Sequence, residues 1–492
     1  MNFIDGFKRE SSKKLSQNGA EAFSSTGSNV LNLFSSVGNL RNVSDEDIRK
    51  KFLSSYAENP KLTSNIVLYT RSIRDGCGGL GERRVGRILL QELSKVEPQT
   101  IINNFKKIVD IGRFDDLYSF ISTPVEKDMW NFIRECWAKD TINMRANKPI
   151  SLMAKWLKSV NTSSEESRQL GRKTARELGL PESAYRKCLS AFRKYLNVLE
   201  VKMSAKEWSA IEYSQVCSLA MNKYRTAFYN HDEERFQQYI EEVKNGNNKI
   251  NSSVLYPHDI VRKYFKDNFT DVEEVQWKAL PNYVEGNQDI LCLCDVSGSM
   301  TRPDYIPMSA SIALGIYFAE RNKGAYKNLY LTFTDDCNFI EIDPTESLYQ
   351  KIQTVERAGI GYSTDLDLAF YRIFEVAKRT NDVPQALIVL SDMEINNYVG
   401  QETCSIVEKW EQKYEEIGLK MPKLILWNLE SGSGINKTYL DQIYNPNISY
   451  ISGYSSSTFS NMCTLMNYGA YEAMKKILEQ DVFQWEVRDE EI

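Results

Sequence analysis

The sequence predicts a protein of two main domains, an α-helical N-terminal domain followed by an α/β domain built on a doubly wound, mostly parallel sheet. The chain has 492 residues, which is too long for one ordinary core. In its first part apolar residues recur three and four positions apart, as on one face of a helix. Beyond residue 285 short apolar runs alternate with segments of helical spacing, which is typical of strands and helices in turn.

The first segment is rich in Ser, Asn and Gly, so residues 1–44 are predicted to be a polar arm with little regular structure. A helical domain is predicted for residues 45–286. Ser44 is followed by three acidic residues, which is typical of a capped helix start. Helical spacing continues in residues 66–73, 85–93, 101–109, 187–199 and 208–221. Short polar breaks favour stacked helical hairpins, with an irregular helical bundle as the alternative.

The α/β domain is predicted for residues 287–492. Its predicted strands are the short apolar runs at residues 290–294, 329–333, 386–390, 424–427 and 448–451. Buried runs of this kind, separated by helices, indicate a mostly parallel sheet that is covered on both faces. Ligands of such sheets bind where the strands end, at the carboxyl edge.

Oxygen-bearing side chains from three separate stretches of the chain are predicted to lie at this edge. Asp295, Ser297 and Ser299 come directly after the first strand, Thr364 precedes a helical segment, and Asp392 follows a later strand. Magnesium prefers six oxygen ligands in octahedral geometry and keeps some waters, so hydroxyls with one or two carboxylates suit it. The sequence therefore predicts a site for Mg²⁺ or Mn²⁺. The alternative is that Asp295 and Ser297 only cap a turn.

The order Asp-x-Ser-x-Ser, a distant Thr and a distant Asp resembles the metal-ion-dependent adhesion site of von Willebrand A domains. The resemblance implies that Ser297, Ser299 and Thr364 offer hydroxyls to the metal. It also implies that Asp295 and Asp392 supply carboxylates, directly or through water. In that family an acidic side chain of a partner protein often completes the metal shell, so an open coordination position is implied here.

Charge is distributed unevenly along the chain. Residues 1–286 hold 44 Lys and Arg against 36 Asp and Glu, a net +8, whereas the remaining residues hold 17 against 30, a net −13. The basic part suits a polyanion such as RNA, and the acidic part suits cations. Nine cysteines without a CxxC pair, and the lack of any apolar stretch of about 20 residues, predict a cytoplasmic protein without a membrane span.

A glycine-rich turn is the densest motif of the N-terminal half. Its G-x-G-x-x-G pattern is formed by Gly76, Gly78 and Gly81. A dinucleotide fold needs this pattern directly after a strand, but a helical segment precedes it here. The arginines around the turn are Arg74, Arg83, Arg84 and Arg87. Exposed amides and guanidinium groups are predicted to hold an RNA phosphate there. The alternative is that Asp75 and Glu82 pair with these arginines and lock the loop.

Further basic residues are predicted to contact RNA: Arg113, Lys155, Arg186, Lys187, Arg193 and Lys194. The last four form two pairs seven residues apart, so they lie near one face of a helix. Tyr185 and Tyr195 adjoin these pairs. Basic groups give phosphate affinity and aromatic rings stack on unpaired bases, a combination typical of proteins that bind single-stranded RNA. The alternative for each cluster is a solvated helix face.

The N-terminal half also resembles the TROVE module of Ro ribonucleoproteins, and more closely an uncharacterised relative of that module found in bacteria, plants and phages. The matching stretches are residues 18–20, 74–83, 112–117, 155–157, 185–187 and 256–258. Ro-type proteins pack HEAT-like helical repeats into a ring closed by a von Willebrand A domain. They bind small structured RNAs outside the ring and thread RNA ends through its hole, so the resemblance implies a non-catalytic RNA-binding protein.

The leading functional hypothesis is therefore an RNA-binding protein of Ro type that also holds a divalent cation. The alternative is a metal-dependent protein-interaction module, or a structural component of a phage or bacterial assembly, which binds an acidic partner and no RNA. No enzymatic activity is expected, because neither His231 nor His258 belongs to a recognisable triad and no G-x-S-x-G nucleophile motif is present. The salt dependence of RNA binding separates the two hypotheses.

Overall fold

The computed structural model describes residues 9–15, 21–73, 77–252, 255–284, 289–334, 336–358, 361, 364–393, 406–429, 439–440 and 445–486. The chain forms two compact units. Unit 1 combines residues 1–85 with residues 252–484, and unit 2 combines residues 86–251 with residues 485–492. Unit 1 thus contains residues from all three predicted segments, and the predicted boundaries at residues 44 and 286 stay predictions.

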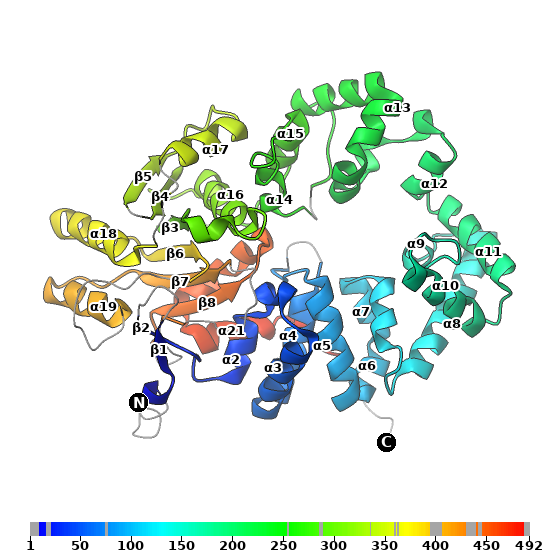
Figure 1. The fold of residues 1–492 in the computed structure, drawn as a ribbon, viewed down its shortest axis with the longest axis horizontal. Helices are drawn as coiled ribbons and strands as arrows, with labels where there is room; N and C mark the ends of the chain where they lie inside the picture. The colour runs from blue at the N-terminus through cyan, green and yellow to red at the C-terminus, as the bar shows by residue number, and fades with distance from the viewer. Residues whose placement is uncertain are drawn as a thin grey trace. The chain divides into compact units, whose positions relative to one another are not determined.

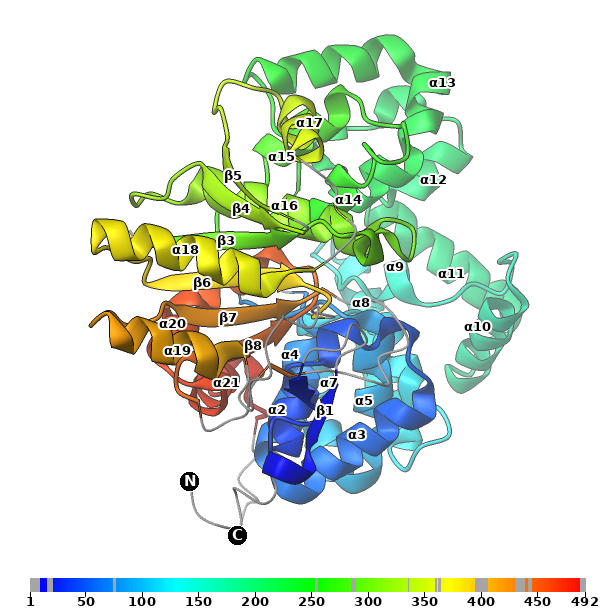
Figure 2. The same ribbon diagram turned by 60° about the vertical axis from the view of Figure 1, so that its left-hand side comes forward.

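A six-stranded sheet lies at the centre of unit 1. Its strands are β3 (Ile290–Asp295), β4 (Leu329–Phe333), β5 (Cys337–Glu341), β6 (Ala386–Ser391), β7 (Lys423–Asn428) and β8 (Ile448–Ser452). They follow the order β5-β4-β3-β6-β7-β8, with every neighbouring pair parallel except β4 and β5 (Figure 2). Each of the five predicted apolar runs forms a strand. Strand β5 was not predicted, because most of its side chains are exposed or half-buried and give no apolar run.

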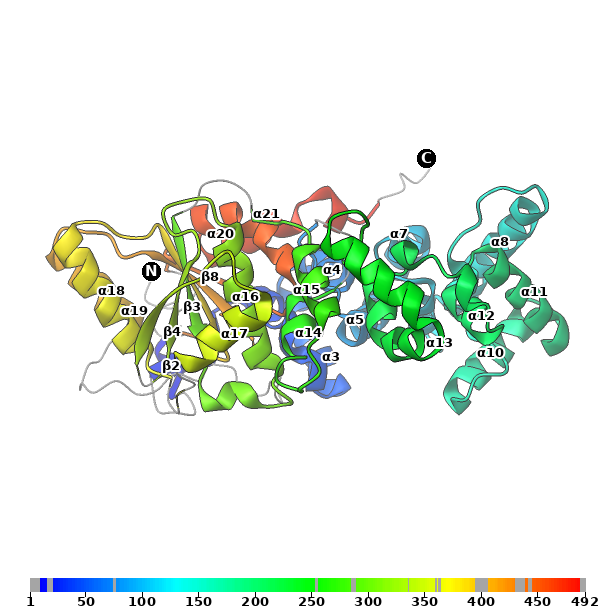
Figure 3. The same cartoon turned by 90° about the horizontal axis from the view of Figure 1, so that it is seen from above.

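Helices cover both faces of this sheet, as predicted. They are α16 (Ile306–Arg321), α17 (Leu348–Arg357), α18 (Leu366–Thr380), α19 (Ile406–Glu416), α20 (Met462–Asn467) and α21 (Ala470–Leu478). Helices α18 and α19 lie on one face, and α16 and α21 lie on the other (Figure 3). Helix α16 approaches β3 closely because Gly315 has no side chain: a Cβ there would lie 2.4 Å from the Sγ of Cys294.

The N-terminal segment is part of unit 1, and the prediction of a polar arm with little regular structure is wrong for residues 29–42. Its elements are β1 (Lys13–Leu15), β2 (Glu21–Phe23), α2 (Asn29–Phe34), the 3₁₀ helix η1 (Val37–Asn42), α3 (Asp45–Glu58) and α4 (Pro60–Arg71). The apolar side chains Val30, Leu31, Leu33 and Phe34 are fully buried. Their burial stabilises a short helix that composition alone did not indicate. Helix α3 begins after Ser44, whose hydroxyl caps it as predicted.

The N-terminal helices pack on the last strand and last helix of the α/β domain, and α2 and α4 lie beside α21 (Figure 1). The amide of Gly38 donates to the hydroxyl of Ser452 at 3.0 Å. The Nδ2 of Asn65 donates to the carbonyl oxygen of Leu478 at 3.2 Å. Unit 1 therefore completes its core with helices from the opposite end of the chain.

Two further helices precede the sheet in sequence and belong to the same unit. Helix α14 (Pro257–Val261) packs against α16, and α15 (Asp271–Lys278) packs against α14 and α17. Thr270 begins α15 with a capping box in which Glu273 accepts hydrogen bonds from the Thr270 amide and hydroxyl. The end of the predicted helical domain is thus integrated with the α/β domain.

In unit 2, residues 86–251 form helices that are joined by turns and loops. From α5 onward the helices are α5 (Arg83–Val96), α6 (Pro98–Asn103), α7 (Phe105–Ile111), η2 (Phe114–Phe120), α8 (Glu126–Arg145), α9 (Met153–Trp156), α10 (Glu165–Glu177), α11 (Glu182–Tyr195), α12 (Leu199–Ser204), η3 (Trp208–Ala210), η4 (Tyr213–Gln215) and α13 (Ser218–Lys244). In the described part of the chain, none of the helices has the length and apolar character needed to cross a membrane.

The helix predicted for residues 208–221 is wrong, because this stretch holds two 3₁₀ helices and only the start of α13. The guanidinium of Arg235 donates to the carbonyl oxygens of Trp208 and Ile211, at 3.0 and 2.9 Å. Tyr213 packs edge-on against Phe228 and a second aromatic ring of α13. These tertiary contacts use carbonyls that a continuous helix would need for its own hydrogen bonds.

Candidate functional site

The predicted metal-site residues converge at the carboxyl edge of the sheet. Strands β3 and β6 are parallel neighbours, and Cys294 lies opposite Leu390 in their register. The strands therefore end side by side, at Asp295 and Ser391. The hydroxyl of Ser391 donates to Asp295 Oδ2 at 2.6 Å, and the amide of Ser297 donates to Asp295 Oδ1 at 2.9 Å. These bonds fix the Asp295 carboxylate at the strand end.

The three predicted hydroxyls form a row beside this carboxylate. Ser297 Oγ and Ser299 Oγ lie 3.1 Å apart, and the hydroxyl of Thr364 donates to Ser297 Oγ at 3.1 Å. Thr364 immediately precedes α18, whose first turn is capped by Asp365 through a bond from the amide of Leu368. The helix start predicted around Thr364 is thus confirmed. Side chains separated by more than sixty residues in sequence meet at one point.

The carboxylates of Asp295 and Asp392 are both buried and lie close enough to repel each other. Asp295 is fully buried, and 8% of Asp392 is exposed. Burial and the neighbouring Asp392 carboxylate raise the pKa of Asp295 to about 7, although hydrogen bonds from Ser391 and Ser297 oppose the shift. Ser299 is exposed, so the cluster opens to solvent on that side.

The donor set fits a hard divalent cation. It consists of oxygen atoms alone, from three hydroxyls and two carboxylates, and Mg²⁺ and Mn²⁺ prefer such ligands. The carboxylate of Asp392 carries the same charge as that of Asp295, and a cation bound between the two would offset their repulsion. Within the part of the chain that the structure describes, no group of three or more His, Cys, Asp or Glu side chains is placed to hold a metal.

One residue of this cluster was not among the predicted site residues. Ser391 ends β6, donates to Asp295 and accepts a hydrogen bond from the amide of Met393 at 3.0 Å. The available signal was its position directly before Asp392, at the end of a predicted strand. Its parallel pairing with β3 decides that it reaches Asp295, and the sequence does not reveal which strands are neighbours.

The glycine-rich turn packs within unit 1. Residues 74–76, which include the predicted RNA contact Arg74, lie outside the described residues. Gly78 has a φ of 73°, and a Cβ on it would lie 2.4 Å from Asn461 Nδ2. The buried Glu82 pairs with Arg41 at 2.6 Å and not, as the alternative had it, with the arginines after the turn. The turn thus serves close packing against the segment that follows β8.

The arginines that follow the turn differ in their exposure and in their hydrogen-bond and ion-pair partners. Arg83 is exposed at the start of α5. Arg84 forms an ion pair with Asp45 and donates to the carbonyl oxygen of Val43 at 2.8 Å. In unit 2, Arg87 lies between two carboxylates of η2, Asp115 at 2.9 Å and Asp116 at 2.7 Å. The donors of Arg84 and Arg87 are therefore used inside the protein.

Two other predicted RNA contacts of unit 2 also have internal partners. The guanidinium of Arg113 lies 4.3 Å from the ring centroid of Trp156. That of Arg193 donates to the carbonyl oxygens of Ala154 and Leu157, at 2.8 and 2.7 Å. These two arginines join neighbouring helices of the unit.

The remaining basic residues face solvent. Lys155 is exposed, and its ammonium lies 5.4 Å from the Trp156 ring centroid. Arg186, Lys187 and Lys194 are exposed on α11 and form no ion pair with any residue that the structure describes. The structure thus separates the predicted set into arginines that hold the fold and cations that face solvent.

The chain is similar to two protein families described as domains of unknown function, to one viral protein and to one solved structure. A family model described as "Domain of unknown function (DUF2828)" matches residues 16–177 and 151–287, and one described as "Domain of unknown function (DUF7788)" matches residues 289–490. The chain is 25% identical over 460 residues to the uncharacterized protein L728 of Acanthamoeba polyphaga mimivirus, covering 85% of this chain and 79% of that protein. It is also similar to the crystal structure of the Deinococcus radiodurans Ro (RSR) protein, with 14% identity, 92% of this chain and 99% of that chain covered, and a TM-score of 0.46. Since the two DUF2828 matches together span more than half of the chain, this protein belongs to the DUF2828 family.

Proposed function

We propose that this protein binds a divalent cation, Mg²⁺ or Mn²⁺, through Asp295, Ser297, Ser299, Thr364 and Asp392. The observation that supports the proposal is the row of three hydroxyls beside two acidic side chains at the ends of β3 and β6. The cation supplies a Lewis-acidic centre for an oxygen ligand. Its role is binding rather than catalysis.

The arrangement leaves one coordination position for a partner. With one oxygen from each of the five side chains, the set falls short of the six ligands that octahedral Mg²⁺ prefers, so a water or an outside carboxylate takes the remaining position. Ser299 is the exposed member of the set, and a ligand approaches from its side. We therefore infer that a protein with an acidic side chain is the partner of this site.

Adding Mn²⁺ to the full chain should raise its thermal midpoint by several degrees, because a ligand at about 100 times its dissociation constant stabilises the folded state by ~2.7 kcal/mol. The double variant Ser297→Ala, Thr364→Val removes two hydroxyls with little change in volume and should lose this shift. Thr380→Val is a matched control, because its hydroxyl bonds only to backbone carbonyls at the exposed end of α18. The proposal is wrong if the unmodified chain shows no Mn²⁺-dependent shift and no binding by electron paramagnetic resonance.

RNA binding is a second candidate function, supported by the charge of unit 2. Residues 86–251 hold 27 Lys and Arg against 21 Asp and Glu, a net +6. Arg186, Lys187 and Lys194 lie exposed on one helix and form no ion pair with the residues that the structure describes, so their charge is available to phosphates. Arg193 is not part of this proposed contact, because its guanidinium donates to Ala154 and Leu157.

Reversing Arg186, Lys187 and Lys194 to Glu should weaken binding of a labelled single-stranded RNA at least tenfold. The slope of log affinity against log salt should fall by about two, since each lost phosphate contact on a single strand contributes ~0.7. Fluorescence anisotropy in 50 to 200 mM KCl measures both quantities. Reversing Lys378, Arg379 and Lys420, which are exposed in unit 1, gives the same change in net charge and should have little effect. Equal losses in the two variants would show that net charge, not this surface, controls binding.

A further inference from the structure

The loop that carries two of the proposed ligands is held from outside the α/β domain. We call residues 297–305 the metal loop, because they contain Ser297 and Ser299. We call residues 257–278, which comprise α14, α15 and the residues between them, the bracket segment. The bracket segment precedes the first strand of the sheet in sequence, and its contacts reach the metal loop and the helices beside it.

The first contact is ionic and directed at one residue of the metal loop. The Nε of Arg262 donates to the carbonyl oxygen of Asp304 at 3.0 Å, and its second nitrogen pairs with the Asp304 carboxylate. Lys266 approaches the same carboxylate at 2.8 Å. Arg262 thus holds both the backbone and the side chain of Asp304, a directional arrangement that a single charge pair does not provide.

The second contact is aromatic and acts on the next residue. The rings of Phe265 and Tyr305 stack with centroids 5.2 Å apart and planes 4° from parallel. Asp304 and Tyr305 have φ values of 55° and 59°, in the left-handed region that residues other than glycine seldom adopt. Such a backbone persists when its surroundings impose it, and the Arg262 and Phe265 contacts are positioned to do so.

Backbone hydrogen bonds connect residues 304–305 of the metal loop with the proposed metal-binding residues Ser297 and Ser299. The amide of Tyr305 donates to the carbonyl oxygen of Thr301 at 2.8 Å, and that of Arg302 donates to the carbonyl of Ser299 at 3.2 Å. The amide of Met300 donates to the carbonyl of Ser297 at 3.1 Å. A change in the position of residues 304–305 is therefore transmitted through short backbone links to both ligand residues.

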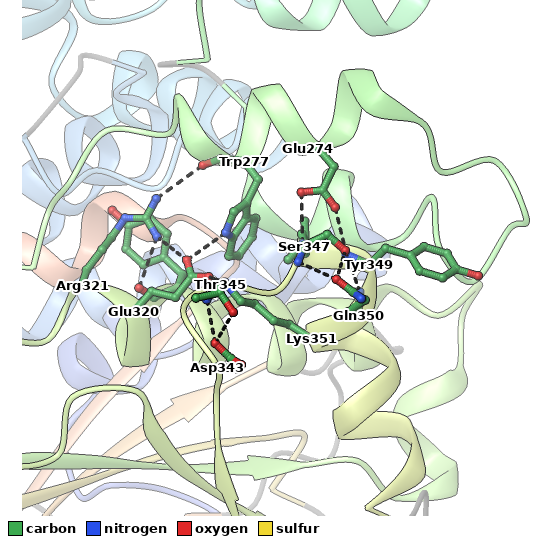
Figure 4. Close-up of polar contacts among 12 residues, drawn as sticks. Glu274, Trp277, Glu320, Arg321, Asp343, Thr345, Ser347, Tyr349, Gln350 and Lys351 are labelled. Atoms are coloured by element: carbon green, nitrogen blue, oxygen red, sulfur yellow. Dashed lines mark hydrogen bonds and ion pairs between the residues drawn. The ribbon is translucent and has the colours of Figure 1, made fainter. Parts of the chain in front are cut away.

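The other end of the bracket segment is fixed to the helices beside the sheet (Figure 4). The indole of Trp277 donates to Glu320 Oε2 at 2.9 Å, and Lys351 donates to Glu320 Oε1 at 2.8 Å. Glu274 accepts hydrogen bonds from the amides of Leu348 and Tyr349 at the start of α17, at 3.1 and 3.0 Å. Through these bonds Trp277 and Glu274 anchor the end of the bracket segment to α16 and α17.

We propose that Arg262 and Phe265 are positioning residues that fix the metal loop in the conformation that aligns the Ser297 and Ser299 hydroxyls. The affinity for the cation then depends on side chains that never contact it. This inference rests on the proposed metal site, whereas the positioning of the loop itself does not require a bound cation. It assigns a function to a segment that directly follows unit 2 in the chain.

Two measurements on the full chain test the proposal. The first is hydrogen exchange of peptides covering residues 297–305 without any divalent cation, and the second is the Mn²⁺ dissociation constant from electron paramagnetic resonance. Arg262→Ala and Phe265→Ala should each speed exchange in the metal loop and weaken Mn²⁺ binding about five- to tenfold, within the usual range of coupling between sites. Arg134→Ala is the matched control, because Arg134 also donates to one residue's backbone oxygen and carboxylate, those of Glu177 in unit 2. It should change neither quantity.

Conservative variants separate positioning from general damage to the fold. Phe265→Tyr keeps the stacked ring and should retain both values, whereas Phe265→Leu keeps apolar volume without the ring and should behave like Phe265→Ala. Unchanged exchange and unchanged Mn²⁺ affinity in Arg262→Ala and Phe265→Ala would overturn the inference. If the unmodified chain binds no Mn²⁺, the proposed metal site fails, and the exchange measurement still decides whether these two residues position the loop.

Discussion

Replacing Gly38 by alanine should lower the free energy of unfolding of unit 1 by about 3 kcal/mol, the upper part of the usual range for overpacking. A Cβ at this position would lie 2.5 Å from the amide nitrogen of Gly453 and 2.6 Å from the carbonyl carbon of Ser452. Both contacts are with backbone, so no side-chain rotation relieves them. Separation of η1 from the end of β8 is the remaining way to remove the clash.

Chemical denaturation in cation-free buffer measures this effect, with Gly298→Ala as the control. A Cβ at Gly298 meets no atom within 4 Å, so that variant should unfold at nearly the same denaturant concentration as the unmodified chain. If Gly38→Ala were equally stable, the packing of the N-terminal helices on β8 would contribute little. The expected loss instead implies that a fragment of residues 287–492 lacks part of its own core, so the proposed metal site is best tested in the full chain.

Replacing Arg41 by alanine should cost about 3 kcal/mol at neutral pH, the lower end of the usual cost of breaking a buried ion pair, because Glu82 is buried but 31% of the Arg41 side chain is exposed. The guanidinium of Arg41 lies 2.6 to 2.9 Å from the carboxylate oxygens of Glu82 and 4.7 Å from the ring centroid of Tyr454. Glu82 is 4% exposed with Arg41 in place, so its charge is largely shielded from water by the residues around it. The uncompensated carboxylate, rather than the lost contact, accounts for most of the cost.

The same variant should make stability depend more steeply on pH. Burial already raises the pKa of Glu82 above its ordinary value of 4.5, and Arg41 is the main group that opposes the rise. Without Arg41 the pKa rises further, so the folded state binds more protons than the unfolded state between about pH 5 and the raised pKa. The free energy of unfolding then falls as pH increases through that window. Urea denaturation at pH 5 and pH 8 should show a larger difference for Arg41→Ala than for the unmodified chain.

The double variant Arg41→Ala, Glu82→Gln removes the titrating group and should lose this additional pH dependence. If the pH dependence persisted, another buried group would be responsible. His258 packs close by against Tyr256 and Tyr454, and burial lowers its pKa to about 4. A histidine with a lowered pKa stabilises the fold as pH rises, which is opposite in sign to the expected effect and distinguishes the two groups.

The sheet and its site were predictable to a large extent from sequence. The five apolar runs that were predicted as strands are β3, β4, β6, β7 and β8 in the structure. They were recognisable because strands buried on both faces need continuous apolar residues. Asp295 and Ser297 were placed at the site by the rule that parallel strands end at one edge, and Thr364 by the resemblance to a metal-ion-dependent adhesion site. Their hydrogen bonds bring the three residues together. The proposed metal and its affinity stay predictions.

Other elements depended on contacts that no local pattern reveals. Strand β5 is an edge strand whose side chains are mostly exposed or half-buried. Residues 208–221 do not form a continuous helix, and the carbonyls of Trp208 and Ile211 accept tertiary hydrogen bonds from Arg235. The basic residues predicted to bind RNA looked alike in sequence. In the structure Arg84, Arg87 and Arg193 are bonded to other residues of the protein, whereas Arg186 and Lys187 form no ion pair with the described residues.

The sequence by itself determined the alternation of strands and helices and the oxygen-rich strand ends, because hydrophobic periodicity and the residues that follow each strand are local properties of the chain. Only the tertiary structure decided that residues 29–71 and the bracket segment belong to the unit that carries the sheet. It also decided which cations are free to meet a partner. These two features depend on contacts between segments that are hundreds of residues apart in sequence. In such contacts the packing of the segments, not their neighbours in sequence, decides which apolar area is buried and which charges are paired.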